Sequence, residues 1–151
     1  MSEDNPIRVF VAHNFQQSDD YLRVFEFLES VERFFYLNVS KPEDMPDTGG
    51  MEAIKEALIK QIKECEAVIV PASFYLEQND LARFEMDVAE ANEKPLIVIR
   101  PFGGVAETPK ELHDRVKEHI EWNEREIVDA LKRQARLEDT SRWETIEFTL
   151  D

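Results

Sequence analysis

The amino-acid sequence predicts an α/β fold in which helices cover both faces of a central parallel sheet. Short apolar runs rich in β-branched residues, which are typical of buried strands, alternate with segments whose apolar residues repeat at helical spacing. Strands and helices that alternate in this way are joined by right-handed crossovers, which make the strands parallel. The order of the elements therefore fixes the fold class before any motif is considered.

Four strands are predicted. Three of them are the nearly continuous apolar runs at residues 7–12, 67–71 and 96–100. The fourth, at residues 34–39, is indicated by three consecutive aromatic residues followed by Leu37 and Val39, a composition with high β propensity.

Four helices are predicted between and after these strands. Apolar residues spaced three and four apart indicate helices over residues 21–28 and 51–65, and two more are expected at about 80–92 and 124–136. The last begins clearly, because Asn123 can act as its N-cap with Glu126 three residues later. Together the elements predict one domain, residues 1–151, with a flavodoxin-like three-layer sandwich. Folds of this kind bind ligands at the carboxyl ends of their strands, which here are followed by residues 13–20, 41–50, 72–79 and 101–108.

The composition and charge of the chain limit its expected partners and cellular location. The chain has 151 residues, and 33 acidic against 18 basic residues give a net charge of −15, which argues against nucleic acid or an anionic membrane as partner. Cys65 is the single cysteine, occupies an apolar helix stripe and is expected in the core. The first residues are acidic and polar, unlike a secretion signal, and every apolar run is much shorter than the about 20 residues that span a bilayer. These two features predict a cytoplasmic protein.

The segments after the strands lack the motifs of several enzyme classes. The loop after the first strand has one Ser and neither Gly nor Thr, which disfavours flavin phosphate binding, and it lacks the acidic pair of response-regulator receivers. The glycine pairs 49–50 and 103–104 are better interpreted as turns than as phosphate-binding loops, and no Gly-x-Ser-x-Gly turn is present. His13, His113 and His119 are scattered and form no metal-ligand set with the one Cys. The last two are expected on a solvated helix or loop.

Glu85 is the one carboxylate in an unexpected position. At ~100° per residue, the predicted helix 80–92 turns an apolar arc toward the core, and Glu85 lies within it. The arc is made of Leu81, Phe84, Val88 and Ala91. A carboxylate among apolar neighbours must be paired, hydrogen-bonded, raised in pKa or open to a cleft; the sequence leaves these alternatives open.

Three further features follow strand ends. His13 comes directly after the first strand and is either a binding residue or a hydrogen-bonded loop histidine. Phe74 and Tyr75 follow the third strand and form either a pocket wall or a cover over the core. The polar segment 41–50 is rich in turn formers, and loops of this length are usually functional or mobile.

An ordered series of motifs over residues 7–131 resembles the Thoeris-type TIR-like family of prokaryotic antiphage proteins. The matching pieces are Val-Phe-Val-Ala-His-Asn at 9–14, Asn-Val-Ser-Lys-Pro-Glu-Asp-Met-Pro at 38–46, Ile-Lys-Glu-Cys-Glu-Ala-Val-Ile-Val at 62–70, Phe-Glu-Met-Asp-Val-Ala at 84–89, Arg-Pro-Phe-Gly at 100–103 and Trp-Asn at 122–123. Residues 136–151 lie outside the resemblance and are expected to form a C-terminal extension that can add an edge strand.

The resemblance implies a TIR-type fold and cleavage of the nicotinamide–ribose bond of NAD. In this family the cleavage can be followed by internal transfer to a cyclic ADP-ribose isomer, and that product, not the protein, activates a separate NAD-depleting effector as an antiphage signal. NAD is then substrate, and no cofactor is expected. By resemblance Glu85 is the essential catalytic residue, while His13 and Asn14 lie near the site and 41–50 is the BB loop.

The chain departs from the pattern of this family at two positions. Leu81 stands where active members usually place an aromatic residue in the ribose pocket, and Ala12 stands where Ser is common. With Phe74 as pocket wall, the expected binding residues are His13, Asn14, Phe74 and Leu81. An anionic dinucleotide also needs a local positive patch in so acidic a chain. The candidates for it are Arg8, Arg23, Arg83 and Arg100.

Two other functions remain open. One is a TIR interaction module that forms a homo-oligomer or binds a partner without chemistry. The other is a nucleoside-processing transferase on a related sandwich, which would act on free nucleosides in preference to NAD.

Overall fold

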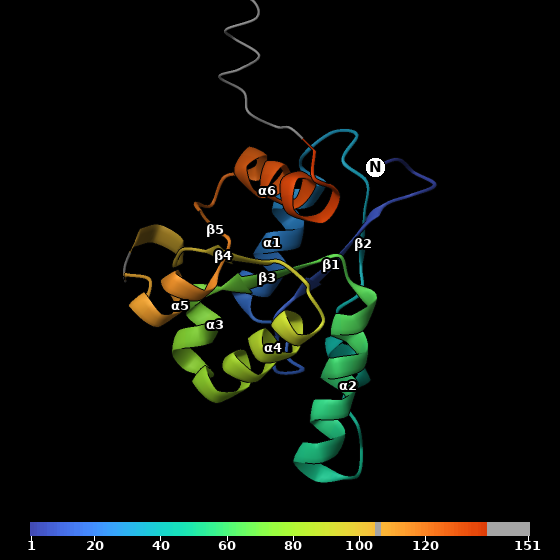
Figure 1. Cartoon of the computed structure of the whole chain (residues 1–151), viewed down its shortest axis with the longest axis vertical. Coiled ribbons are helices and arrows are strands. Elements are labelled where there is room, and N and C mark those ends of the chain that lie inside the picture. Colours follow the sequence, from blue (N-terminus) through green and yellow to red (C-terminus); the bar gives the residue numbers. More distant parts are fainter. Residues whose placement is uncertain (105–106, 139–151) are drawn as a thin grey trace, which may run out of the picture.

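The centre of the protein is a five-stranded, entirely parallel sheet with the strand order β2-β1-β3-β4-β5 (Figure 1). The computed structural model describes residues 1–104 and 107–138. The strands are β1 (Ile7–Val11), β2 (Tyr36–Asn38), β3 (Ala67–Pro71), β4 (Leu96–Ile99) and β5 (Glu118–Ile120). The predicted α/β class with a flavodoxin-like three-layer sandwich is confirmed.

Helices form the two outer layers. One face of the sheet packs against α1 (Asp19–Glu29) and α6 (Glu124–Arg136), and the opposite face packs against the remaining helices. Those helices are α2 (Gly50–Glu64), α3 (Ala72–Glu77), α4 (Asn79–Ala91) and α5 (Lys110–Arg115), and two short 3-10 turns lie at Pro42–Asp44 and Phe102–Gly104.

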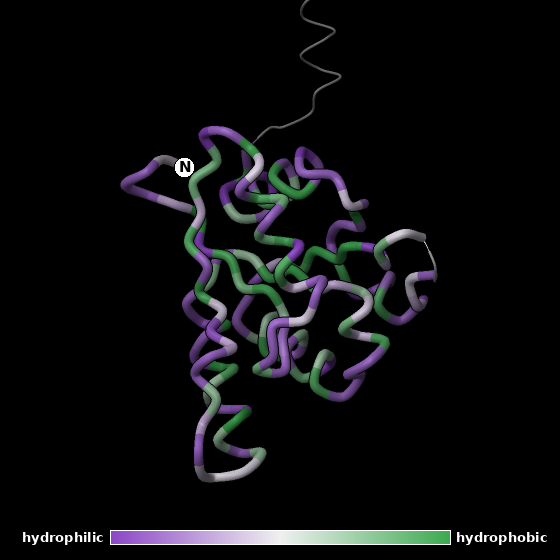
Figure 2. The backbone as a smooth tube through the Cα atoms, turned by 180° about the vertical axis from the view of Figure 1, so that it is seen from behind, coloured by the Kyte–Doolittle hydropathy of each residue, from purple (hydrophilic) through white to green (hydrophobic). Residues whose placement is uncertain are grey.

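Alternation along the strands divides the core in two. In β3 all five residues are buried, with Val68 and Val70 in the core beneath α2 and α4, and Ile69 in the core beneath α1 and α6. Neighbouring strands continue this pattern, since Ile69 pairs with Ile97 of β4, which lies on the same face. The apolar residues accordingly concentrate along the central strands (Figure 2). Burial on both faces explains why these strands are continuous apolar runs.

The observed elements agree with the predicted ones to within a few residues, with five additions. The weak strand predicted at 34–39 is the edge strand β2, and the helices predicted at 80–92 and 124–136 are α4 and α6. The Asn123 side chain accepts hydrogen bonds from the main-chain N–H groups of Arg125 and Glu126, which confirms it as the N-cap. The sequence analysis did not predict α3, α5, β5 or the two 3-10 turns. Residues 139–151, which hold most of the expected C-terminal extension, lie outside the described residues.

Two predictions about single residues are tested here. Cys65 is fully buried at the end of α2, as expected. His119, expected on a solvated helix or loop, is instead partly buried in β5, where its ring stacks on that of His113 with centroids 3.8 Å apart. The expectation failed because a three-residue strand with one apolar residue leaves no recognisable pattern in the sequence.

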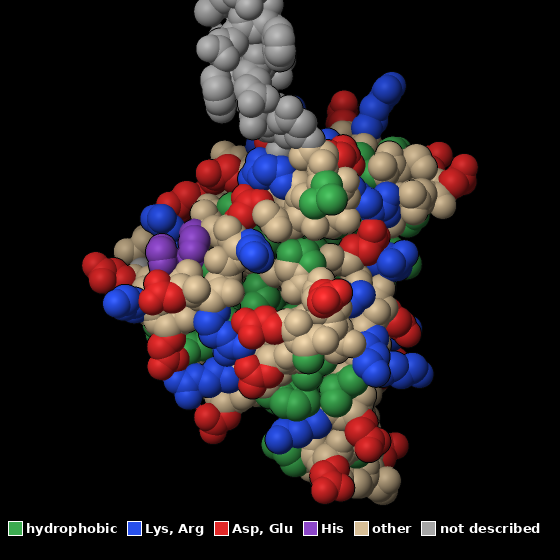
Figure 3. Space-filling model, in the orientation of Figure 1, with side chains coloured by type: hydrophobic (Ala, Val, Ile, Leu, Met, Phe, Trp, Pro, Cys, Tyr) green, Lys and Arg blue, Asp and Glu red, His purple; other side chains and the backbone are tan. Residues whose placement is uncertain are grey.

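In the described part of the chain, none of the helices has both the length and the apolarity that a bilayer crossing requires. Basic and acidic side chains are interspersed over the face seen in Figure 3, and apolar side chains gather there where α2 and α4 lie together.

Candidate functional site

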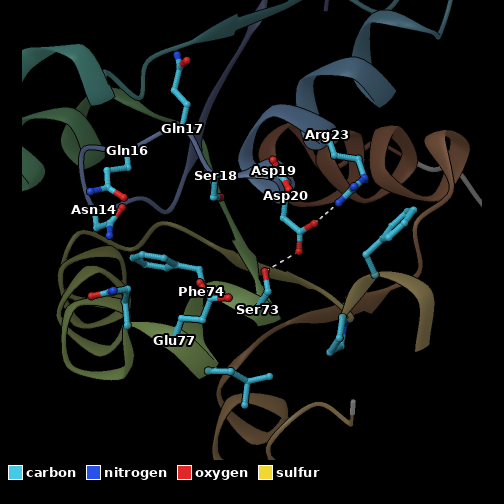
Figure 4. Close-up of a pocket in the computed structure, with 14 residues that line it drawn as sticks. Asn14, Gln16, Gln17, Ser18, Asp19, Asp20, Arg23, Ser73, Phe74 and Glu77 are labelled. Atoms are coloured by element: carbon cyan, nitrogen blue, oxygen red, sulfur yellow. Dashed lines mark hydrogen bonds and ion pairs between the residues drawn. The ribbon is translucent and has the colours of Figure 1, made fainter. Parts of the chain in front are cut away.

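A pocket of about 620 Å³ lies at the carboxyl ends of β1, β3 and β4 (Figure 4). Its walls come from residues 14–20, 73–78 and 101–102, which belong to three of the four segments expected to carry the site, and from Arg23 one turn further along α1. From β1 the chain continues to β2 on one side, whereas β3 lies on the other side of β1. The pocket therefore lies at the point where the strand order reverses, which is the usual ligand site of an open α/β sheet. Its volume is in the range of small-molecule sites.

The helix starts around this pocket are built by local sequence. Ser18 is the N-cap of α1, and its hydroxyl accepts a hydrogen bond from the Tyr21 main-chain N–H at 3.2 Å. Asp19 and Asp20 follow in the first turn, where negative charge is favourable. On the other side α3 begins directly after β3, which places Ser73 and Phe74 against the pocket.

Asp20 organises the polar wall of the pocket. Its carboxylate accepts a hydrogen bond from the Ser73 hydroxyl at 2.5 Å and forms an ion pair with Arg23 (Figure 4). The Arg23 guanidinium also lies over the Phe102 ring, 3.8 Å from its centroid, in a cation–π contact. Arg23 is the only cationic side chain among the described residues that line this pocket. A bound anion would have to share Arg23 with Asp20.

Only one of the four arginines considered for a positive patch lies at the pocket. Arg83 pairs with Glu111, and Arg100 pairs with Glu121, both outside it. Arg8 donates from its side chain to the Glu64 carbonyl at the opposite end of the strand. The described residues also contain no group of three or more His, Cys, Asp or Glu side chains arranged to hold a metal ion.

Glu85 lies behind the pocket wall and not in it. Its side chain is fully buried, and Oε1 accepts a hydrogen bond from the His13 main-chain N–H at 3.0 Å. Oε2 has no hydrogen-bond partner within residues 1–104 and 107–138. Burial raises the pKa of Glu85 well above 4.5, and the single bond from His13 offsets this only in part. Of the alternatives that the sequence left open, the structure selects a hydrogen-bonded carboxyl with a raised pKa.

The buried arc of α4 differs from the predicted one. Its fully buried residues are Ala82, Glu85, Met86 and Ala89. Leu81, Phe84 and Val88 are only half-buried and Ala91 is exposed. The arc is rotated because α4 packs on α2 as well as on the sheet. The rotation places Glu85 at the centre of the buried face.

His13 is a buried, hydrogen-bonded histidine. Its Nδ1 accepts from the Phe15 main-chain N–H at 2.9 Å, so the ring proton is on Nε2, which donates to Oε1 of Gln61 at 2.8 Å. Phe15 has a positive φ of 64° at this bend after β1. Burial lowers the pKa of His13, while the bond to Gln61 and the charge of Glu43 oppose the shift.

The predicted site residues are divided among three places. Asn14 and Phe74 line the pocket at the strand ends. Leu81 instead lines a second pocket of about 540 Å³ between α2, α3 and α4, and the two pockets share Glu77 and Gln78. His13 and Glu85 line neither pocket and are buried directly behind Asn14. Sequence reasoning missed Asp20, Ser73 and Gln61; the only usable signal was Gln61, a polar residue inside the apolar stripe of α2.

No protein-family model matches this chain, and no curated protein matches it either.

Proposed function

We propose that the protein cleaves the nicotinamide–ribose bond of NAD in the pocket at the strand ends, with Glu85 as the catalytic carboxylate. One observation carries the proposal: the Glu85 carboxyl binds the main chain of His13, and the next residue, Asn14, lines the pocket. The carboxyl is thus separated from a polar, ligand-sized pocket by the main chain of a single segment. The resemblance to TIR-like proteins supplies the substrate.

The chemistry needs a carboxylate more than it needs an acid. When the bond between the ribose C1′ and the pyridinium nitrogen breaks, its electron pair leaves with nicotinamide, which departs neutral. The positive charge remains on an oxocarbenium-like ribose, which an adjacent carboxylate stabilises strongly in a site with little water. Water then attacks C1′ and loses a proton to give ADP-ribose. Attack by a nucleophilic atom of the same ADP-ribose, again with loss of a proton, gives a cyclic isomer that would act as signal for a separate effector.

The buried state of Glu85 defines a closed, resting conformation in this proposal. For the carboxyl to reach a ribose, the segment that begins at His13 must move. Its movement also returns Glu85 to a more polar environment, which brings its pKa back toward the ordinary value and yields the carboxylate. The same requirement makes NAD cleavage slow in the isolated chain and faster in any assembly, such as a homo-oligomer, that holds the segment open.

The test is release of nicotinamide from NAD, followed by chromatography and mass spectrometry, for the purified protein alone and under crowding. Glu85→Gln should reduce the rate at least a hundredfold, whereas Glu90→Gln on the exposed face of the same helix should leave it unchanged. Glu77→Gln removes the carboxylate that lines both pockets. Full activity of Glu85→Gln together with loss in Glu77→Gln would assign the chemistry to Glu77. Cleavage of deoxynucleosides but not of NAD would identify a nucleoside-processing transferase.

A second candidate is an assembly module without chemistry. It is favoured by the exposed apolar side chains of Met45 and Met51, which are 54% and 57% exposed at the two ends of one loop. Met51 also borders the second pocket with Leu81 and Phe84, where apolar side chains gather on the surface (Figure 3). Contiguous apolar surface of this kind is typical of interaction sites. Oligomerisation in light scattering that Met51→Lys abolishes, without nicotinamide release in any state, would establish this function.

A further inference from the structure

We infer that Gln61 is a positioning residue that joins the loop after β2 to the His13 ring and, through the His13 main chain, to Glu85. The hydrogen bonds that make this link are independent of any activity. Its importance for catalysis rests on the proposed function.

The atom roles of the Gln61 carboxamide follow from its partners. The Lys41 main-chain N–H can only donate, and it lies 2.8 Å from Gln61 Oε1. The same oxygen accepts from His13 Nε2 at 2.8 Å, because the other ring nitrogen of His13 is occupied as an acceptor by Phe15. The Gln61 amide nitrogen donates to the Lys41 carbonyl at 3.3 Å. One side chain therefore holds both main-chain groups of Lys41 and the ring of His13.

These bonds are buried, so they are costly to leave unmade. Gln61 is 6% exposed and His13 is 1% exposed. Gln61 lies beside Leu58 and Ile62 on the buried face of α2. A polar residue there is tolerated because its oxygen accepts from two donors. Removal of the carboxamide would leave the His13 Nε2–H and the Lys41 N–H without their acceptor.

The link continues from the His13 ring to Glu85. The His13 ring is fixed on one side by Gln61 and on the other by the Phe15 main chain. The main-chain N–H of His13 itself is the donor to Glu85. Residue 13 cannot move without breaking either the ring contacts or the bond to Glu85. Lys41 directly precedes the 3-10 turn Pro42–Asp44, so a displacement of this loop acts on the oxygen that holds His13. Loop position and Glu85 burial are thereby coupled through one side chain.

The first experiment measures the hydrogen bonds themselves by NMR. In Gln61→Leu the exchange rate of the Lys41 amide should rise at least tenfold, and the His13 Nε2–H, which loses its acceptor while Phe15 keeps the proton on Nε2, should shift its signal and exchange faster with water. Gln61→Glu, whose carboxylate still accepts from both donors, should keep the Lys41 amide protected and raise the pKa of His13, on which Glu43 already acts in the same direction. Lys60→Leu, one residue earlier and exposed, is the matched control. Unchanged Lys41 exchange and an unchanged His13 ring in Gln61→Leu would overturn the inference. If Gln61→Leu does not fold, an unchanged His13 pKa in Gln61→Glu would do so.

The second experiment addresses catalysis. If Glu85 is catalytic, Gln61→Leu should raise kcat for NAD at least tenfold, because it frees the segment that must move, while KM changes less than threefold; Gln61→Glu, which still holds His13 and Lys41, should keep kcat close to the wild-type value. Equal kcat values in the wild type and in Gln61→Leu would overturn the catalytic part of the inference. Failure of the proposed function is recognised separately, because wild-type protein would then release no nicotinamide while the NMR effects at Lys41 and His13 persist.

Discussion

The main-chain N–H of His13 donates a hydrogen bond to the carboxyl of Glu85 across a distance of 3.0 Å, although the two residues are 72 positions apart in the chain. The bond joins the segment just after β1 to the middle of α4. Among the described residues it is the only hydrogen bond to this carboxyl, whose second oxygen has no partner there. Burial of this carboxyl with a single hydrogen bond therefore lowers the stability of the folded protein.

Glu85→Gln should change the pH dependence of stability. The pKa of Glu85 in the folded protein lies above its value of 4.5 in the unfolded chain. The contribution of the protonated side chain to the free energy of unfolding is therefore fully present below about pH 4.5 and is lost as the pH rises through the pKa of the folded protein. The Gln side chain does not titrate, so the variant should gain stability relative to wild type as the pH rises from 4.5 to 7.5. Urea unfolding at both pH values checks this. Parallel stability curves for the two proteins would contradict a raised pKa, and Glu90→Gln should follow the wild type.

The imidazoles of His13 and His119 should titrate below pH 6.5 in the folded protein. Burial is the largest cause in both, and for His119 the neighbouring His113 and Arg100 lower the pKa further. Because the unfolded chain takes up these protons first, stability should fall as the pH decreases below 6.5. Two-dimensional NMR of the ring signals measures both midpoints. His119→Phe should show a smaller loss of stability than wild type between pH 6.5 and 5, and a His119 midpoint at or above 6.5 would refute the prediction.

Arg23→Met should weaken binding of ADP-ribose about tenfold, which is about 1.4 kcal/mol, because it removes the only cation among the described pocket residues. Asp20→Asn should have the opposite effect, since it releases Arg23 from its ion pair. Titration calorimetry at low salt compares both with Arg125→Met on the exposed side of α6. Equal affinity of all three variants would place the anion site elsewhere.

Arg136→Lys should destabilise the fold by about 1–2 kcal/mol. The Arg136 guanidinium holds both carboxylate oxygens of Glu66, at 2.5 and 3.0 Å, and also reaches the Pro6 carbonyl. Burial alone would raise the pKa of Glu66, but the hydrogen bonds from Arg136 and the Arg8 main chain outweigh it and lower the pKa. The stabilisation is therefore present above pH 4.5 and is lost as the pH falls. Thermal unfolding at pH 7 and pH 3.5 tests this, with exposed Arg125→Lys expected to match wild type; an equal deficit of Arg136→Lys at both pH values would contradict it.

The strands and most helices could be predicted because their patterns are local. Residues 67–71 are apolar throughout because β3 is buried on both faces, and Asn123 caps α6 through hydrogen bonds to residues two and three positions later. Such signals need only a few neighbouring residues. The strand β5 and the helix α5 are too short and too polar to produce a pattern; β5 is recognised by its pairing with β4, and α5 packs against the same strand.

The sequence by itself determined the α/β class, the parallel sheet, the edge at which a pocket would lie and the unusual position of Glu85 on its helix. It could do so because periodicity and strand order depend on the chain alone. Only the tertiary structure decided that Asn14 and Phe74 share a pocket, that Leu81 borders another and that Glu85 is sealed behind His13. Those outcomes depend on how α2 and α4 pack on the sheet, and on side chains such as Gln61 whose partners are distant in sequence. Burial and hydrogen bonding of this kind are set by long-range contacts, which no local pattern records.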